Sequence, residues 1–334
     1  MKYLFIVKRS GDMLHEKALV AHIIRVCVSM HVNYDIVVTE TFMQEESIVK
    51  LKTAALKDEP LRIIVCGTKE TLHFTINGFL NDTGQNIEIG YLPYDGVYDV
   101  FSTFKEVNAN TVWNVENLMY GDAVDMDAVK VNNRYCIATV NAGVDATYAL
   151  LRSWIYSFLP HLSHKHWAAR FITFFLEYTA LLTGIPNKSV TMLLNGYEQI
   201  TSNYLFFVFT NTRTYGAGYT CAADAESDDG QLNMYLMHRI PFWNMPRALK
   251  GYRSADVMKS SFMNENNLHV ARRIVKADVT FDVSVDICLD GNVYMHTASL
   301  SIEVIPAALR FILPNFSIET STSFNISRLG SVVQ

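Results

Sequence analysis

Apolar, strand-like runs alternate with helix-like segments through the first 92 residues of the chain. The strand-like runs are Tyr3–Val7, Tyr34–Thr39, Ile63–Cys66 and Ile87–Leu92. The segments with helical spacing of apolar residues between them are Leu14–Met30, Ser47–Leu56 and Leu72–Phe79. Strands that alternate with helices favour a parallel, doubly wound α/β sheet, in which ligands bind at the carboxyl ends of the strands.

The second half of the chain has a different pattern, with short strands separated by turns. Ala128–Val131 and Arg134–Val140 flank an Asn-Asn pair, which predicts a hairpin. The further strand-like segments are Ser189–Leu194, Tyr204–Thr210, Leu232–Met237, Val279–Asp282, Val285–Leu289 and Ser299–Val304. This pattern predicts an antiparallel sandwich or barrel.

The length and the net charge of the chain limit the classes of protein to which it can belong. A chain of 334 residues can form two domains, and a net charge of -5 argues against a nucleic-acid partner. The five cysteines are scattered without metal-site spacing, as expected of free thiols in a reducing compartment. The apolar run at the N-terminus is too short for a signal peptide, and no apolar run is long enough to span a membrane.

The stretch Arg62–Leu80 combines a strand, a turn of small polar residues at Gly67–Thr71 and a helix start. Such a turn lets the backbone approach an anion, and the N–H groups at the start of the helix attract it. Many α/β proteins have the same connection without a ligand. The pattern alone therefore leaves both a phosphate-binding turn and a structural turn open.

The same stretch resembles the nucleotide-binding motif GGDGTxNEVxNG of the diacylglycerol kinase and sphingosine kinase family. Gly67, Thr71 and Asn77-Gly78 match, whereas Thr68, Lys69 and Glu70 replace two glycines and an aspartate. The family's NPxSG turn is matched by Ser10 and Gly11, and its LPxGTGND loop by Leu92, Pro93 and Asp99. Asp95, Val97 and Tyr98 depart from that third loop and bring bulk and negative charge to it.

Motifs of the second half resemble the family in the same order. Tyr215–Leu232 is similar to GGGMxLxPxAxxDDGxL and keeps Asp228 and Asp229. Asp290 falls where the family has DGE, with Asn292 in place of the glutamate. Arg310–Pro314 is similar to the closing strand that returns to the first domain.

The resemblance implies a nucleotide-binding-type α/β domain of the NAD kinase and diacylglycerol kinase type at residues 1–124 with 306–334. It also implies a β-rich lipid or substrate domain at 125–305. It further implies ATP-dependent phosphorylation of a lipid hydroxyl such as that of diacylglycerol, with Mg²⁺ as the metal. The residues that would bind the nucleotide are Ser10, Gly11, Gly67, Thr68, Lys69, Thr71 and Asp99. Asp290 would be the general base, and Asp228 with Asp229 would hold a second, structural metal ion.

The substitutions in all three nucleotide loops keep a second hypothesis open. The alternative to an active kinase is a pseudokinase without a required cofactor, which binds lipid, nucleotide or a protein. An equally plain interpretation of Asp228 and Asp229 is an ordinary Asp-Asp-Gly turn between strands.

The aromatic-rich segment Tyr148–Thr183 is interpreted either as helices that pack on the sheets or as an apolar edge that meets lipid. The expected partner is thus a lipid substrate or a membrane surface, for a cytoplasmic protein that binds the membrane peripherally. A homodimer is left open.

Overall fold

The computed structural model describes residues 1–9, 13–41, 43–56, 59–80, 86–93, 99–104, 114–144, 146–147, 150, 175, 189–215, 219–220, 222–239, 269–291 and 293–315. The chain forms two compact units. Unit 1 comprises residues 1–98, 104–126 and 307–334, and unit 2 comprises residues 99–103 and 127–306.

Unit 1 is built on a parallel sheet. Its strands are β1 (Lys2–Lys8), β2 (Asn33–Thr39), β3 (Leu61–Gly67) and β4 (Ile87–Pro93). The order is β2-β1-β3-β4, and the end of β15 (Val293–Leu313) pairs in parallel with β4 through Arg310 and Glu88. Every residue of β3 is buried, as expected for a parallel strand that is covered on both faces.

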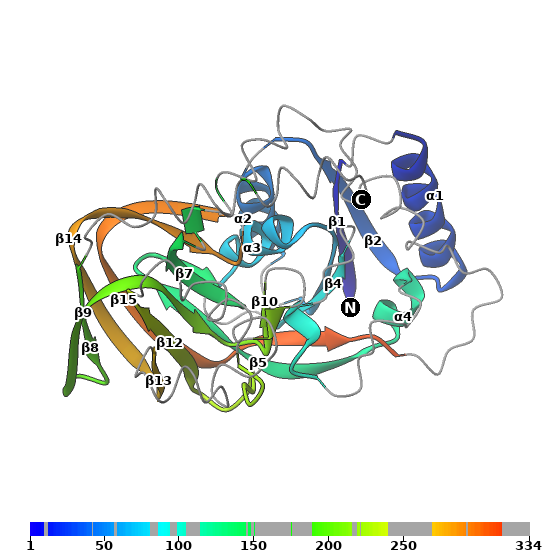
Figure 1. Cartoon of the computed structure of the whole chain (residues 1–334). Helices are drawn as coiled ribbons and strands as arrows, with labels where there is room; N and C mark the ends of the chain where they lie inside the picture. The colour runs from blue at the N-terminus through cyan, green and yellow to red at the C-terminus, as the bar shows by residue number, and fades with distance from the viewer. Residues whose placement is uncertain are drawn as a thin grey trace. The chain divides into compact units, whose positions relative to one another are not determined.

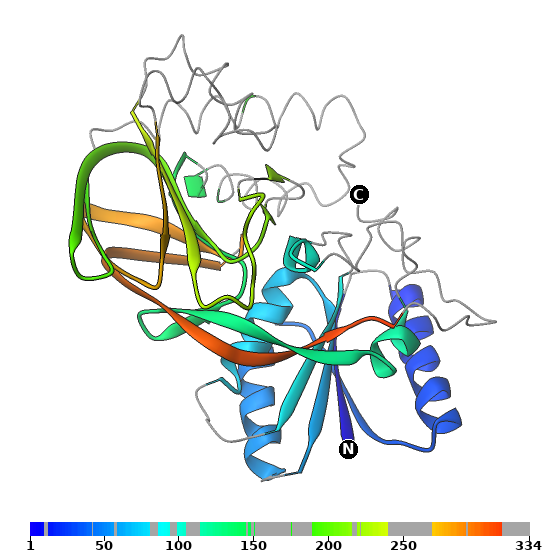
Figure 2. The same ribbon diagram turned by 90° about the horizontal axis from the view of Figure 1, so that it is seen from below.

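Helices cover both faces of this sheet. They are α1 (Met13–Ser29), α2 (Gln44–Ala55), α3 (Lys69–Asn77) and the short α4 (Val115–Met119). α2 packs against α3 on one side of the strands, and α1 packs near α4 on the other (Figure 2). The prediction of a parallel sheet with helices on both faces is therefore confirmed. In the described part of the chain, no helix is long and apolar enough to cross a membrane.

Unit 2 is antiparallel. Its strands include part of β5 (Asp122–Val131), β6 (Arg134–Cys136), β7 (Thr139–Gly143), β8 (Ser189–Leu194), β9 (Glu198–Thr210), β12 (Leu232–His238), β13 (His269–Ile274) and β14 (Lys276–Leu289). A separate two-stranded sheet joins β10 (Thr214–Tyr215) to β11 (Tyr219–Thr220), and the short helix η1 (Asp99–Phe101) belongs to the same unit.

Four strands of unit 2 pair in a closed cycle (Figure 1). β9 and β14 each pair with β7 along one half and with β8 along the other. Aromatic side chains pack between these strands, and the rings of Phe207 and Phe281 stack with centroids 5.9 Å apart. This closure confirms the barrel form of the predicted antiparallel part.

Three expected elements differ in detail. The predicted strand Arg134–Val140 is two strands, because the chain turns at Ile137 and Ala138. The two strands expected between Val279 and Leu289 are a single strand, β14, whose pairing register with β15 shifts between Thr280 and Val285. The polar residues inside that irregular stretch made β14 look like two strands in the sequence.

Candidate functional site

In unit 1 the carboxyl ends of three neighbouring strands meet at one edge of the sheet. β1 ends at Lys8, β2 at Thr39 and β3 at Gly67, and Lys8 pairs in register with Thr39. This is the edge at which open α/β sheets bind their ligands. The predicted phosphate-binding turn lies here.

The turn after β3 is shorter than the sequence motif suggested. α3 begins at Lys69, so Lys69, Glu70 and Thr71 form its first turn and do not extend a glycine loop. The expected helix start at Leu72 was therefore wrong by one turn. Only Thr68 separates the strand from the helix, which limits how far this backbone can wrap around an anion.

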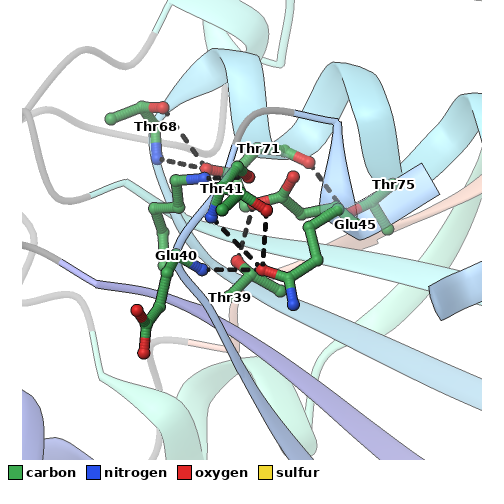
Figure 3. Close-up of polar contacts among 9 residues, drawn as sticks. Thr39, Glu40, Thr41, Glu45, Thr68, Thr71 and Thr75 are labelled. Atoms are coloured by element: carbon green, nitrogen blue, oxygen red, sulfur yellow. Dashed lines mark hydrogen bonds and ion pairs between the residues drawn. The ribbon is translucent and has the colours of Figure 1, made fainter. Parts of the chain in front are cut away.

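Thr71 closes the turn on itself (Figure 3). The backbone N–H of Thr68 donates to Oγ1 of Thr71 over 3.3 Å, and the two hydroxyl oxygens also lie 3.3 Å apart. A Cβ atom added to Gly67 would meet Oγ1 of Thr71 at 2.7 Å, so the glycine is required by this close approach. Thr71 thus satisfies a backbone donor that a phosphate would otherwise use.

The two charged residues at the start of α3 are poorly placed for phosphate capture. Lys69 is buried, with 8 % of its surface exposed. Burial raises the pKa of the Glu70 carboxyl; the Lys8 and His73 charges lower it and the Glu45 charge raises it further. The helix start therefore combines a buried cation with an acidic group.

Lys8 and Glu45 form an ion pair at the same edge. Nζ of Lys8 lies 2.8 Å from Oε1 of Glu45 and donates a second hydrogen bond to the carbonyl oxygen of Thr41 over 3.1 Å. Thr39 donates its hydroxyl hydrogen to the same oxygen of Glu45 over 2.6 Å (Figure 3). The Glu45 side chain has no exposed surface, whereas 23 % of the Lys8 side chain is exposed. The second oxygen of Glu45 is buried without a hydrogen-bond partner among the described residues.

Sequence reasoning missed this pair. The expected strand Tyr3–Val7 places Lys8 at the ligand-binding edge, but nothing in the sequence indicates that Lys8 has a partner there. Glu45 gave no signal, since an acidic residue in the first turn of a helix is common and is normally exposed.

Of the other predicted nucleotide residues, Asp99 belongs to unit 2, and Ser10 and Gly11 are not described. Asp99 begins η1 in unit 2, where its carboxylate accepts a hydrogen bond from Oγ1 of Thr214 over 3.1 Å and is buried. Ser10 and Gly11 are outside the described residues, as are Asp95, Val97 and Tyr98.

Asp290 lies in the turn between β14 and β15 of unit 2. Its Oδ1 accepts hydrogen bonds from the backbone N–H groups of Ile137, Ala138 and Thr139, over 3.2, 2.8 and 3.3 Å. Its own N–H donates to the carbonyl oxygen of Thr139 over 2.8 Å. These contacts explain the break between β6 and β7, because the amides that turn toward Asp290 cannot continue a strand ladder.

Asp290 is buried beside the thiol of Cys136. The residue is 3 % exposed and adopts a left-handed backbone conformation with φ of 49°. Burial raises the pKa of the neighbouring Cys136 thiol well above its ordinary value, and the charge of Asp290 raises it further. Three amide donors fix the orientation of the Asp290 carboxylate, which suits either a positioned base or a structural clamp.

The acidic pair Asp228 and Asp229 lies in the turn before β12. Asp228 is exposed, whereas Asp229 forms an ion pair with Arg273 of β13. The other oxygen of Asp229 accepts the backbone N–H of Gln231 over 2.9 Å. The next residue, Gly230, donates its N–H to Oδ2 of the buried Asp127 over 2.7 Å.

Comparisons with known proteins bear on both units. No family model matches the chain. A protein of Shewanella frigidimarina named "Probable lipid kinase YegS-like" is 23 % identical over 274 residues, which covers 81 % of this chain and 82 % of that protein. The crystal structure of a diacylglycerol kinase from Bacillus anthracis superposes with a TM-score of 0.64 at 14 % identity, over 95 % of this chain and 98 % of that one.

The resemblance to the diacylglycerol kinase and YegS-like lipid kinase family is confirmed. The structural match shows that the chain has the fold of the diacylglycerol kinases. The chain differs from the family's nucleotide-binding motif at Thr68, Lys69 and Glu70, and the structure describes all three of these residues.

The residues at the expected metal site fit a metal ion poorly. Both oxygens of Asp229 have partners, one of them a guanidinium, and a metal ion would have to displace it. The described residues contain no group of three or more His, Cys, Asp or Glu side chains arranged to hold a metal ion. We therefore derive no catalytic step from a metal at this turn.

Proposed function

We propose that this chain is a lipid kinase-family protein in which phosphate transfer is impaired, and that it acts by binding lipid at a membrane surface. The observation that carries the proposal is the closed turn at Gly67–Thr71, whose Thr68 N–H donates to Thr71. Phosphoryl transfer depends on positioning the phosphates and neutralising their charge, and this turn offers little of either.

The electrostatics of the edge support the same conclusion. Lys8 is neutralised by the buried Glu45, and Lys69 is adjacent to Glu70. Among the described residues at this edge, the Lys8 ammonium is therefore already paired and would have to leave Glu45 to meet a nucleotide. A phosphate group would meet the Glu70 carboxylate at a helix start that normally attracts anions.

In this proposal unit 1 corresponds to a degenerate nucleotide-binding-type domain and unit 2 to the lipid domain. We propose that the lipid domain extends from residue 125 to residue 305, and that the residues on either side of it form the nucleotide-binding-type domain. We propose a peripheral membrane location on the cytoplasmic side, since a lipid ligand has to be reached at a bilayer surface. ATP and Mg²⁺ are then no longer required cofactors.

The test compares lipid binding with phosphate transfer on one preparation of the full chain. Flotation with vesicles of phosphatidylglycerol containing diacylglycerol measures binding, and transfer from γ-labelled ATP with Mg²⁺ measures catalysis. We expect the protein to float with the vesicles and to transfer no label above a protein-free control. Labelled phosphatidic acid formed in proportion to the protein would overturn the proposal.

A second candidate function, an active lipid kinase, is favoured by one observation. Asp290, which the sequence resemblance matches to the family's proposed general base, is oriented by three backbone amides. Base catalysis contributes about 10²–10⁴-fold, so Asp290→Asn should lower any transfer rate by about that factor. Transfer that Asp290→Asn leaves unchanged would show that Asp290 is not the base and would remove the observation that favours this candidate.

A further inference from the structure

We infer that the Asp-Asp-Gly turn before β12 is held by an internal cation, the guanidinium of Arg273, in the place where the family resemblance implies a structural metal ion. The inference is independent of whether the chain transfers phosphate. It rests on the partners of Asp229, Asp127 and Gly230 in unit 2.

Both oxygens of the Asp229 carboxylate have partners within unit 2. Oδ2 pairs with the guanidinium of Arg273, and Oδ1 accepts the N–H of Gln231 over 2.9 Å. The Asp229 side chain is 17 % exposed, so its charge is largely removed from water and needs a cation. Arg273 supplies that cation, and its planar donors suit a carboxylate.

Arg273 reaches the turn from the neighbouring strand β13. Arg273 of β13 pairs with Asn233 of β12, which lies four residues after Asp229. Asn233 in turn donates to Oδ1 of Asp224 over 3.0 Å at the start of the same loop. The pairing of β12 with β13 therefore brings the guanidinium to the turn from an adjacent strand.

The backbone of the turn is also held by hydrogen bonds within unit 2. Asp127 accepts the N–H of Gly230 over 2.7 Å and donates its own N–H to the carbonyl oxygen of Ser227 over 2.7 Å. The hydroxyl of Ser227 lies 2.9 Å from that of Thr103. Gly230 has a φ of 71°, which favours glycine at this position. The turn is thus built from side-chain and backbone partners, with Arg273 as its cation.

The adjacent arginine provides a matched control. Arg272 pairs with Glu198 of β9 over 2.8 Å, and 46 % of its side chain is exposed, compared with 43 % for Arg273. Its partner Glu198 is 33 % exposed, about twice as much as Asp229. Exposed pairs of this kind contribute little to stability.

The experiment measures the thermal unfolding midpoint of the full chain with EDTA and with millimolar Mg²⁺ or Ca²⁺. We expect the wild-type midpoint to be the same in all three conditions. Arg273→Met should lower the midpoint by about 2–4 °C, and Arg272→Met should lower it less. In an Asp229→Asn background, the loss caused by Arg273→Met should largely disappear, because the two residues act as a pair.

Two results would overturn the inference. The first is a wild-type unfolding midpoint that falls with EDTA or rises with the divalent ion, together with an Asp229→Asn midpoint that does not respond to either. The second is an Arg273→Met loss that is no larger than that of Arg272→Met, or that persists in full in the Asp229→Asn background. If Arg273→Met does not fold, Arg273→Lys keeps the charge without the fork of donors and should show a smaller loss in the same assay.

Discussion

The ammonium group of Lys8 lies 2.8 Å from the buried carboxylate of Glu45, at the edge of the sheet where this fold binds its ligands. The pair joins the end of β1 to the first turn of α2, and Thr39 at the end of β2 donates to the same carboxylate oxygen. The ammonium group of Lys8 at this edge is therefore already paired with a carboxylate of the protein itself.

Lys8→Met should destabilise the protein, because it leaves the Glu45 carboxylate buried without its cation. Removing one partner of a buried ion pair costs about 3–5 kcal/mol, and the partial exposure of Lys8 places the expected loss at about 2–3 kcal/mol. Urea unfolding followed by circular dichroism measures it.

The double variant Lys8→Met with Glu45→Gln is the control for that prediction. It removes both charges and should recover most of the lost stability, because the penalty comes from the unpaired carboxylate. If the double variant is as unstable as Lys8→Met, the aliphatic stem of Lys8 provides the stability and the ion pair does not.

Asp290 should have a structural role that is separable from its charge. Asp290→Ala removes the acceptor of three backbone N–H groups and places alanine at a φ of 49°, so we expect a loss of more than about 2 kcal/mol. Asp290→Asn keeps an oxygen acceptor and tolerates the left-handed conformation, so its loss should be about 1 kcal/mol. Chemical denaturation of the two variants in parallel checks the order, and equal losses would contradict the clamp.

The histidines at the ends of β12 and β13 should make the protein less stable in mild acid. Burial lowers the pKa of His238; burial and the charge of His238 lower the pKa of His269. The folded-state pKa of each histidine lies below its unfolded value of about 6.5. The contribution of the two neutral histidines to the free energy of unfolding is therefore complete above that pH and is lost as pH falls from it through the folded-state pKa.

The measurement is the unfolding midpoint between about pH 7 and pH 5, compared with a His238→Gln, His269→Gln variant. The variant should show a flatter profile in this range. Asp35, whose pKa is lowered mainly by a hydrogen bond from Lys52, loses its contribution only at lower pH and should not disturb the comparison. Parallel profiles for the two proteins would contradict the prediction.

The fold could be predicted well where apolar periodicity is strong. Continuous apolar runs placed β1, β3 and β4 within about two residues, because strands covered on both faces contain few polar residues. β14 was predicted as two strands because polar residues interrupt its apolar pattern between Thr280 and Val285. In the structure the strand continues through this stretch, where its pairing register with β15 shifts. The split of Arg134–Val140 depends on Asp290, which lies more than 150 residues away in the chain.

The candidate site was less predictable than the fold. Family motifs identified Asp290, Asp229 and Gly67 by position, but not their partners. The ion pairs of Lys8 with Glu45 and of Arg273 with Asp229 join residues 37 and 44 positions apart through tertiary packing. A single sequence contains no signal for such pairs, since most charged residues lie on the surface without a fixed partner.

The central claim is that the edge at Gly67–Thr71 has lost strong nucleotide binding, and calorimetric titration of the full chain with Mg-ATP tests it most directly. We predict no saturable heat at millimolar Mg-ATP, because Thr71 occupies the Thr68 N–H and Glu45 neutralises Lys8. In a thermal shift assay, Mg-ATP should leave the unfolding midpoint of the same protein unchanged. A ligand that binds and is present at 100 times its Kd would instead stabilise the folded protein by about 2.7 kcal/mol. Micromolar affinity for Mg-ATP would contradict the account and favour an active lipid kinase.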